Sequence, residues 1–138
     1  MSQPQRCGAI AVILRKDGNV LAIERSSTVR APGRLCFPGG GIEEGESEAE
    51  AVQRELQEEL ALEIEPIRRL WQSTTQSGVL LHWWLATTSG TPTANPDEVA
   101  RWFWISFDEL ARHPKTLRSN REFIRAVKTG EIVITDDA

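Results

Sequence analysis

Residues 40–62 constrain this chain more than any other segment, because they join a glycine-rich loop to a helix that carries patterned carboxylates. On a helix with 3.6 residues per turn, positions i, i+3 and i+4 project from one face. Three glutamates have that spacing: Glu55, Glu58 and Glu59. An apolar stripe runs beside these acids, and it places Glu59 nearest the core. The stripe consists of Ala49, Val52, Leu56 and Leu60.

Carboxylates gathered at the edge of a core predict a bound divalent cation. Such groups repel one another and lose hydration, which raises the pKa of at least one of them unless a cation neutralises the cluster. Oxygen ligands favour Mg²⁺ or Mn²⁺, whereas zinc favours Cys and His, and Cys7 and Cys36 lack metal-ligand spacing. A solvated acidic face with an ordinary Arg54–Glu58 pair is the competing interpretation. The glycines at 39–41 favour the metal site, because they let the backbone approach a phosphate closely.

The segment resembles the signature of the Nudix hydrolase family: a Gly, five residues, a Glu, seven residues, then Arg-Glu-aliphatic-x-Glu-Glu-x-Gly-aliphatic. The matching positions are Gly40, Glu46, Arg54, Glu55, Leu56, Glu58, Glu59 and Leu62. Ala61 departs from the signature, since the family has at this position a Gly that usually ends the helix in a left-handed conformation. Either Ala61 adopts that conformation at a cost of about 1 kcal/mol, or the helix runs on and ends differently.

The resemblance implies an enzyme that hydrolyses a diphosphate linkage by water attack, with Mg²⁺ or Mn²⁺ as cofactor. The implied metal ligands are Glu55, Glu58, Glu59 and the backbone carbonyl of Gly39. Glu46 and Arg54 would form an ion pair that supports the site, with Gly40 in the loop above it. One of the glutamates or a downstream acid would activate the water, and the family pattern leaves that choice open. By the same resemblance we favour Glu98 as the downstream acid, with a solvated turn as the alternative.

Candidate substrate contacts come from arginines near the glycine loop and from tryptophans. Guanidinium groups can hold phosphates bidentately, and indole faces can stack on a base. The candidates are Arg25, Arg30, Arg34, Trp71 and Trp84. Trp102 and Trp104 share a strand face opposite Phe103, and one of the two faces must belong to the core. His82 and Cys36 fit better as packed side chains than as a general base and a reactive thiol.

Composition sets limits on the class of protein. The chain has 138 residues, 40% of them hydrophobic and 26% charged, which fits one domain spanning residues 1–138. The sequence has no long apolar run and no hydrophobic stretch in its first residues, so a cytoplasmic protein without a membrane span is expected. Two cysteines give no disulfide framework. The net charge of −4 disfavours broad binding to nucleic acid, whereas a small nucleotide held with a metal remains compatible.

Local signals predict mixed helix and sheet. Residues 8–14 read as a buried strand, and a turn at 16–19 leads to a second strand at 20–25, so these two are expected to form a hairpin. Further strands are expected at 67–74, 79–87 and 101–105. Three Ser-x-x-Glu boxes predict helix starts at Ser47, Ser106 and Ser119. The last helix should end at Gly130 and bury Phe123, Ile124 and Val127.

The fold implied by the resemblance is an α/β/α sandwich with a central mixed sheet. The leading function is hydrolysis of a nucleoside diphosphate derivative or a nucleoside triphosphate. A coenzyme A diphosphatase is the second enzyme reading, because residues 25–40 and 95–99 are similar to that subfamily's motifs at shorter spacing. A nucleotide-sensing module that does not cleave its ligand is the alternative from another class, although such domains usually lose box acids. A homodimer is compatible with the family, and an exposed Trp face would fit it.

Overall fold

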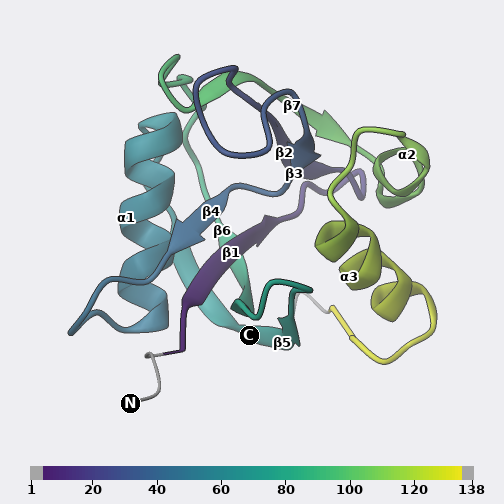
Figure 1. Ribbon diagram of the computed structural model, residues 1–138. Helices are drawn as coiled ribbons and strands as arrows, with labels where there is room; N and C mark the ends of the chain where they lie inside the picture. Colours follow the sequence, from purple (N-terminus) through teal and green to yellow (C-terminus); the bar gives the residue numbers. More distant parts are fainter. Residues whose placement is uncertain (1–4, 135–138) are drawn as a thin grey trace.

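The computed structural model describes residues 5–134, and the outermost parts of the expected domain, 1–4 and 135–138, lie outside the described residues. The strands are β1 (Cys7–Ile13), β2 (Val20–Arg25), β3 (Leu35–Cys36), β4 (Gly39–Gly41), β5 (Glu65–Thr74), β6 (Leu80–Thr87) and β7 (Val99–Ile105). The helices are α1 (Glu48–Leu60), α2 (Phe107–Arg112) and α3 (Arg118–Lys128). Helix α1 lies on one side of the strands, and α2 and α3 lie on the other, so the α/β/α arrangement is confirmed (Figure 1).

The strands form two sheets. A four-stranded mixed sheet has the order β4-β1-β6-β5, with β1 and β6 parallel and the other pairs antiparallel. A three-stranded antiparallel sheet has the order β3-β2-β7. The glycines that the sequence predicts as a loop form the short strand β4, and its pairing with β1 aligns Ile10 with Gly39 and Gly8 with Gly41. This segment, residues 39–41, keeps the name glycine loop and lies directly on the central strand.

The expected hairpin between the first two strands is wrong. The turn forms, because the Arg15 N–H donates to the Asn19 carbonyl and the Gly18 N–H donates to the Arg15 carbonyl. Beyond a single Leu14–Val20 bridge, however, the two strands separate into different sheets. Both edges of β1 are already occupied by β4 and β6, and both edges of β2 by β3 and β7, so neither strand has an edge left for the other.

Alternating side chains build two cores, one on each side of the sheets. On β1, Ala9 and Ala11 face the α1 side, whereas Val12 faces the α3 side. The α3 side is aromatic: Trp83 stacks on Phe123 with 4.6 Å between ring centroids. Trp102 and Trp104 lie on the α1 side and are half-buried. Within residues 5–134, Val133 is the exposed large hydrophobic side chain, so these residues show no exposed Trp face of the kind that would fit a homodimer.

The helix starts follow two of the three predicted boxes. Ser47 forms a complete capping box with Glu50, and the Ser106 hydroxyl accepts from the Glu109 N–H. The prediction at Ser119 is wrong, because α3 begins at Arg118 with Leu117 at its N-cap and without a side-chain cap. The preceding segment fixes this start, since the Leu117 N–H donates to the Leu35 carbonyl at 3.0 Å.

The other end of α3 agrees with the prediction. Gly130 follows the last turn with a positive φ of 83°. Phe123 and Ile124 are buried, and Val127 packs partly buried against the same core. No helix among residues 5–134 has the length and apolar character needed to cross a membrane.

Candidate functional site

Helix α1 presents its acids from a well-anchored position. Val52, Leu56 and Leu60 are completely buried, as the apolar stripe predicts, while Ala49 is half-buried. Glu59, beside the stripe, is 6% exposed. The sequence therefore placed Glu59 correctly at the edge of the core.

Ala61 ends the helix in the left-handed conformation, with φ 48° and ψ 39°. Its N–H donates to the Gln57 carbonyl, and the Leu62 N–H donates to the Leu56 carbonyl. The first of these bonds, which joins the left-handed residue to the carbonyl four residues before it, defines the αL motif that usually carries Gly. The first of the two alternatives for Ala61 is therefore confirmed, and the helix ends where the family's helix ends.

The Glu59 carboxylate is held against the glycine loop. The Gly39 N–H donates to Glu59 Oε1 at 2.9 Å. Burial raises the pKa of Glu59 to about 8, and the negative charges of Glu55 and Glu98 add to this shift. Without a cation, this carboxyl group therefore retains its proton near neutral pH.

The glycines of the loop are required by close contacts. A Cβ atom added to Gly40 would lie 2.5 Å from the Glu55 carboxylate, and one added to Gly39 would collide with the Ala9 carbonyl. Burial also raises the pKa of Glu55, a shift that the neighbouring Arg54 opposes. The loop thus touches two of the three predicted metal ligands through backbone that only glycine can provide.

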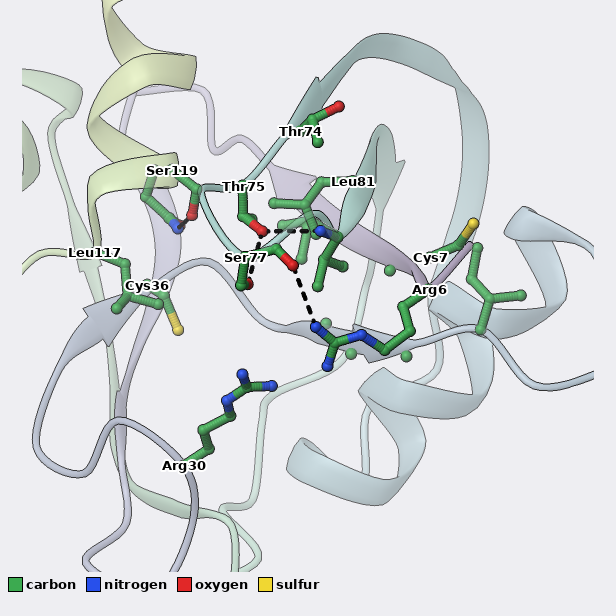
Figure 2. A pocket seen from close by; sticks show the side chains of 18 of the residues that line it. Arg6, Cys7, Arg30, Cys36, Thr74, Thr75, Ser77, Leu81, Leu117 and Ser119 are labelled. Atoms are coloured by element: carbon green, nitrogen blue, oxygen red, sulfur yellow. Dashed lines mark hydrogen bonds between the residues drawn. The ribbon is translucent and has the colours of Figure 1, made fainter. Parts of the chain in front are cut away.

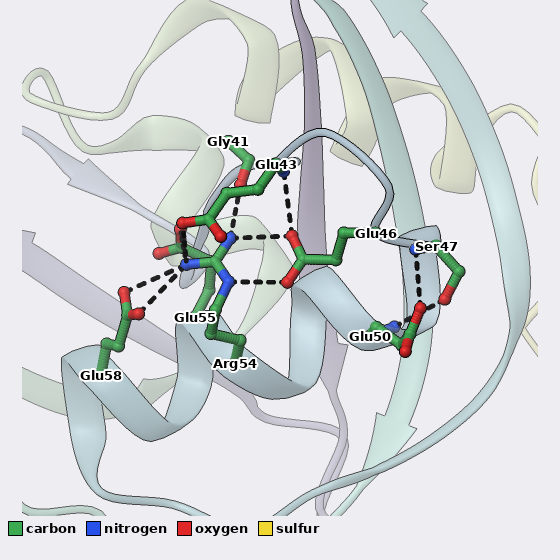
Figure 3. A network of polar contacts seen from close by, with 8 residues as sticks. All are labelled: Gly41, Glu43, Glu46, Ser47, Glu50, Arg54, Glu55 and Glu58. Carbon is green, nitrogen blue, oxygen red and sulfur yellow. Dashed lines mark hydrogen bonds and ion pairs between the residues drawn. The ribbon is translucent and has the colours of Figure 1, made fainter.

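Arg54 organises the outer side of the site (Figure 3). Its guanidinium group donates to both Glu46 oxygens at 2.7 and 3.0 Å and to the Gly41 carbonyl at 2.8 Å. The ion pair expected between Glu46 and Arg54 is therefore present, and it holds the pKa of Glu46 below its usual range. The same guanidinium group donates to Glu55 at 3.1 Å and to Glu58 at 3.2 Å.

Because Arg54 bonds both Glu55 and Glu58, these carboxylates do not converge on one point with Glu59. Among residues 5–134, no group of three His, Cys, Asp or Glu side chains is arranged closely enough to hold a metal ion in this conformation. The donor chemistry nevertheless fits a hard cation, since every available ligand is an oxygen. Glu98 is also suited to a site for a cation, because its Oε2 atom is buried and has no hydrogen-bond partner among the described residues.

A large cavity of about 1490 Å³ opens beside the glycine loop. Its walls come from the loop, the turn between β5 and β6, the start of α3, and the segment after β2 (Figure 2). Arg25 and Arg30, two of the candidate substrate contacts, line it, and the Arg25 side chain donates to the Arg30 carbonyl at 2.6 Å. Arg34 does not line the cavity, and its guanidinium group instead donates to the Thr116 carbonyl at 3.4 Å.

The two candidate tryptophans are not among the residues that line the cavity. Trp71 packs in the aromatic core against Trp83 and Phe123, and its indole N–H donates to Glu131. The Trp84 indole N–H donates to Glu48 at 2.8 Å. Sequence periodicity can place an indole on a strand face, but the neighbouring elements decide what covers that face.

His82 and Cys36 are packed, as expected. His82 is 6% exposed, and its Nδ1 atom is 2.9 Å from the Gln72 amide nitrogen. Burial lowers the pKa of His82 and raises that of the Cys36 thiol to about 11. Sequence reasoning missed Arg6, which lines the cavity and donates to the Ser77 carbonyl at 3.4 Å. A lone basic residue before the first strand gives no signal of that role.

Comparison with known proteins assigns the chain to a family. The family model described as the NUDIX domain matches residues 4–127. An RNA pyrophosphohydrolase of Erythrobacter litoralis is 30% identical over 89% of this chain and 87% of its own length. A CTP pyrophosphohydrolase of Escherichia coli is 29% identical over 76% of this chain and 79% of its own length.

Solved structures agree with this assignment. A MutT NUDIX hydrolase from Burkholderia pseudomallei superposes with a TM-score of 0.78 at 29% identity, covering 91% of this chain and 99% of that chain. Family members generally use divalent metal ions. The chain belongs to the Nudix hydrolase family and is a hydrolase of diphosphate bonds.

Proposed function

We propose that this protein hydrolyses the diphosphate linkage of a nucleoside triphosphate or of a nucleoside diphosphate derivative, with Mg²⁺ as the bound cation and Mn²⁺ as a substitute. One observation carries the proposal: Glu59, buried and with its pKa raised to about 8, lies against the glycine loop that lines the cavity. A buried acid cluster of this kind is stabilised by a cation and is otherwise costly.

Glu55, Glu58, Glu59 and the Gly39 carbonyl are the proposed ligands, with Glu98 as a further acid. Bound there, a divalent cation neutralises phosphate oxygens and lowers the pKa of the attacking water. The protein's own contributions are positional. The Gly39 N–H fixes one oxygen of Glu59, and Arg54 donates to both Glu55 and Glu58, which helix spacing puts on one face of α1. Either Glu98 or one of the box glutamates serves as the general base.

Arg25 and Arg30 are the proposed phosphate-binding residues, because both line the cavity beside the glycine loop. Arg34, Trp71 and Trp84 have other partners, so they take no part in the proposed substrate contacts. The names of the relatives point to nucleotides, either free as CTP or at the end of an RNA. Coenzyme A diphosphatase activity is the second candidate, on the motif similarity of residues 25–40 and 95–99.

Calorimetric titration tests the metal site directly. The purified wild-type protein should bind Mg²⁺ or Mn²⁺ clearly more tightly than the double variant Glu58→Gln/Glu59→Gln. Glutamine keeps the size of each side chain while removing the charge, so the loss measures ligation. Equal binding by the two proteins would end the metal-site proposal.

A screen that detects the cleavage products by ion-exchange chromatography tests the reaction and the substrate. It should contain nucleoside triphosphates, oxidised dGTP, sugar nucleotides, dinucleoside polyphosphates, ADP-ribose, coenzyme A and 5′-triphosphorylated RNA. We expect turnover with Mg²⁺ or Mn²⁺ and a loss of several kcal/mol of transition-state stabilisation in Glu59→Gln. A wild-type protein that binds metal but cleaves none of these compounds would favour the nucleotide sensor.

A further inference from the structure

The segment that carries Glu98 is joined to the end of the acidic helix. The last carbonyls of any α-helix lack partners within the helix. Here the Thr93 N–H donates to the Leu60 carbonyl at 2.7 Å, and the Asn95 N–H donates to the Glu59 carbonyl at 2.8 Å. The Asn95 side-chain amide also donates to the Glu58 carbonyl at 3.2 Å. Asn95 therefore contacts the backbone of two predicted metal ligands.

The same Asn95 shapes the turn that leads to Glu98. Its side-chain oxygen accepts from the Asp97 N–H at 3.1 Å. Its carbonyl accepts from the Glu98 N–H at 3.0 Å and from the Val99 N–H at 2.8 Å. One residue thus links the backbone of Glu59 to the backbone of Glu98 through its main chain and its side chain together.

A second set of bonds holds this turn from the opposite side. The Ser26 and Thr28 hydroxyl groups both donate to the Asp97 carbonyl at 3.0 Å, and the Ser26 N–H donates to the Glu98 carbonyl at 3.1 Å. Ser26 is buried. With both sides held, the Glu98 backbone has little freedom relative to α1, although its Oε2 atom has no partner among the described residues.

We propose that Asn95 is a positioning residue, which sets the place of the Glu98 carboxylate relative to Glu59 by tying the turn at 95–98 to the end of α1. The inference rests on the proposed function, because it gives Glu98 a role beside the metal ligands. Asn95 is not one of the proposed metal ligands, and it does not line the cavity. Residues that orient ligands in this way typically change metal affinity or activity by 10-fold to 100-fold when they are replaced.

Asn95→Ala is the test variant, and Thr93→Ala is its matched control, because Thr93 contacts Leu60 through its backbone only. With the best substrate of the screen, Asn95→Ala should lower kcat by about tenfold or more, change KM by less than about twofold, and weaken Mn²⁺ binding in calorimetry about tenfold. Thr93→Ala should match the wild type in all three. Wild-type kcat and Mn²⁺ affinity in Asn95→Ala would overturn the inference.

A double-mutant cycle with Glu98→Gln separates positioning from general structural damage. If Asn95 acts through Glu98, Asn95→Ala should lower kcat by less than about twofold in the Glu98→Gln background. The role would be refuted if the kcat losses of the two single variants multiplied fully in the double variant. It would also be refuted if Glu98→Gln kept the wild-type kcat. If Asn95→Ala does not fold in thermal unfolding, Asn95→Ser replaces it and must show the same non-additivity. Absence of turnover in the wild type would refute the proposed function instead, and the Mn²⁺ titrations would still decide the inference.

Discussion

At the scale of single residues, Ala61 ends helix α1 in a left-handed backbone conformation that is unfavourable for alanine. Its left-handed backbone places the Cβ atom close to the following carbonyl, at a cost of roughly 1–2 kcal/mol. Glycine removes that cost but gives the unfolded chain more conformational freedom, which offsets roughly 0.4–1 kcal/mol of the stability gained. We expect Ala61→Gly to raise the free energy of unfolding by about 0.5–1 kcal/mol in urea titrations.

The control for this prediction is Ala49→Gly. Ala49 lies in the first turn of α1, where glycine is also unfavourable relative to alanine, by up to about 1 kcal/mol. The two substitutions should therefore move the urea midpoint in opposite directions. A destabilised Ala61→Gly variant would show that the left-handed conformation does not strain Ala61.

Glu59 gives the metal-free protein an unusual dependence on pH. Its pKa is about 8 in the folded chain, whereas an ordinary glutamate titrates near 4.5. Between these values the unfolded chain has lost the proton that the folded chain retains, so the contribution of Glu59 to stability decreases as pH rises through this window. In the presence of a chelator, the free energy of unfolding should be lower at pH 8 than at pH 5.5.

The slope from one such group is at most about 1.4 kcal/mol per pH unit, so the total difference should be a few kcal/mol. Glu59→Gln has no proton to lose and should show a much flatter profile over the same range. Added Mn²⁺ should remove most of the wild-type loss at pH 8, because it neutralises the carboxylate. Parallel profiles for the two chelated proteins would contradict the assigned cause.

At the scale of elements, the start of α1 is attached to the four-stranded sheet through Glu48. Its carboxylate accepts from Arg69 at 2.9 and 2.7 Å and from the Trp84 indole at 2.8 Å. Its Oε2 atom lies 3.4 Å from His82 Nδ1. Side chains of β5 and β6 thereby hold the first turn of the helix whose later turns carry the acids.

Glu48→Ala should lower the free energy of unfolding by about 2 kcal/mol, since it leaves partly buried donors without their acceptor. It should also increase amide hydrogen exchange in the first turn of α1. Glu24→Ala is the matched control, because its pair with Arg101 is more exposed than the Glu48–Arg69 pair and should contribute less than about 1 kcal/mol. Equal losses in the two variants would show that the Glu48 network acts as an ordinary surface pair.

At the scale of the whole molecule, the sheets separate the aromatic core from the core under α1. Phe123 joins α3 to the sheet through its stack on Trp83, and it is completely buried. Phe123→Ala should cost about 3–5 kcal/mol in urea unfolding. Because the acids lie on the other side of the sheet, Mn²⁺ affinity at a temperature where the variant is folded should stay within about twofold of wild type.

Val133→Ala is the control for this substitution, since Val133 is 63% exposed and its truncation should change stability by less than about 0.5 kcal/mol. A large loss of Mn²⁺ affinity in folded Phe123→Ala would contradict the independence of the two sides.

The sequence by itself determined the acidic face of α1, its cap at Ser47, the positions of the five longer strands and the membership of the family, whereas the short strands β3 and β4 were not predicted. These features follow from local periodicity, from side chains three or four residues apart and from a short motif, all of which are properties of neighbouring residues. Ala61 illustrates the limit of such local information, because its neighbours in the sequence allow two different helix ends. The observed end of α1 also involves a distant segment, since the N–H groups of residues 93 and 95 bond its last carbonyls.

Only the tertiary structure decided the separation of the first two strands into different sheets, the cavity lined by Arg6, Arg25 and Arg30, the packing of Trp71 against the aromatic core and the bond of Trp84 to Glu48. It also decided that Glu98 lies beside Glu59, through Asn95 and Ser26, which are far apart in the chain. The physical reason is common to all of these features. Each depends on which edges and faces are already occupied by distant elements, and local propensity contains no information about that competition.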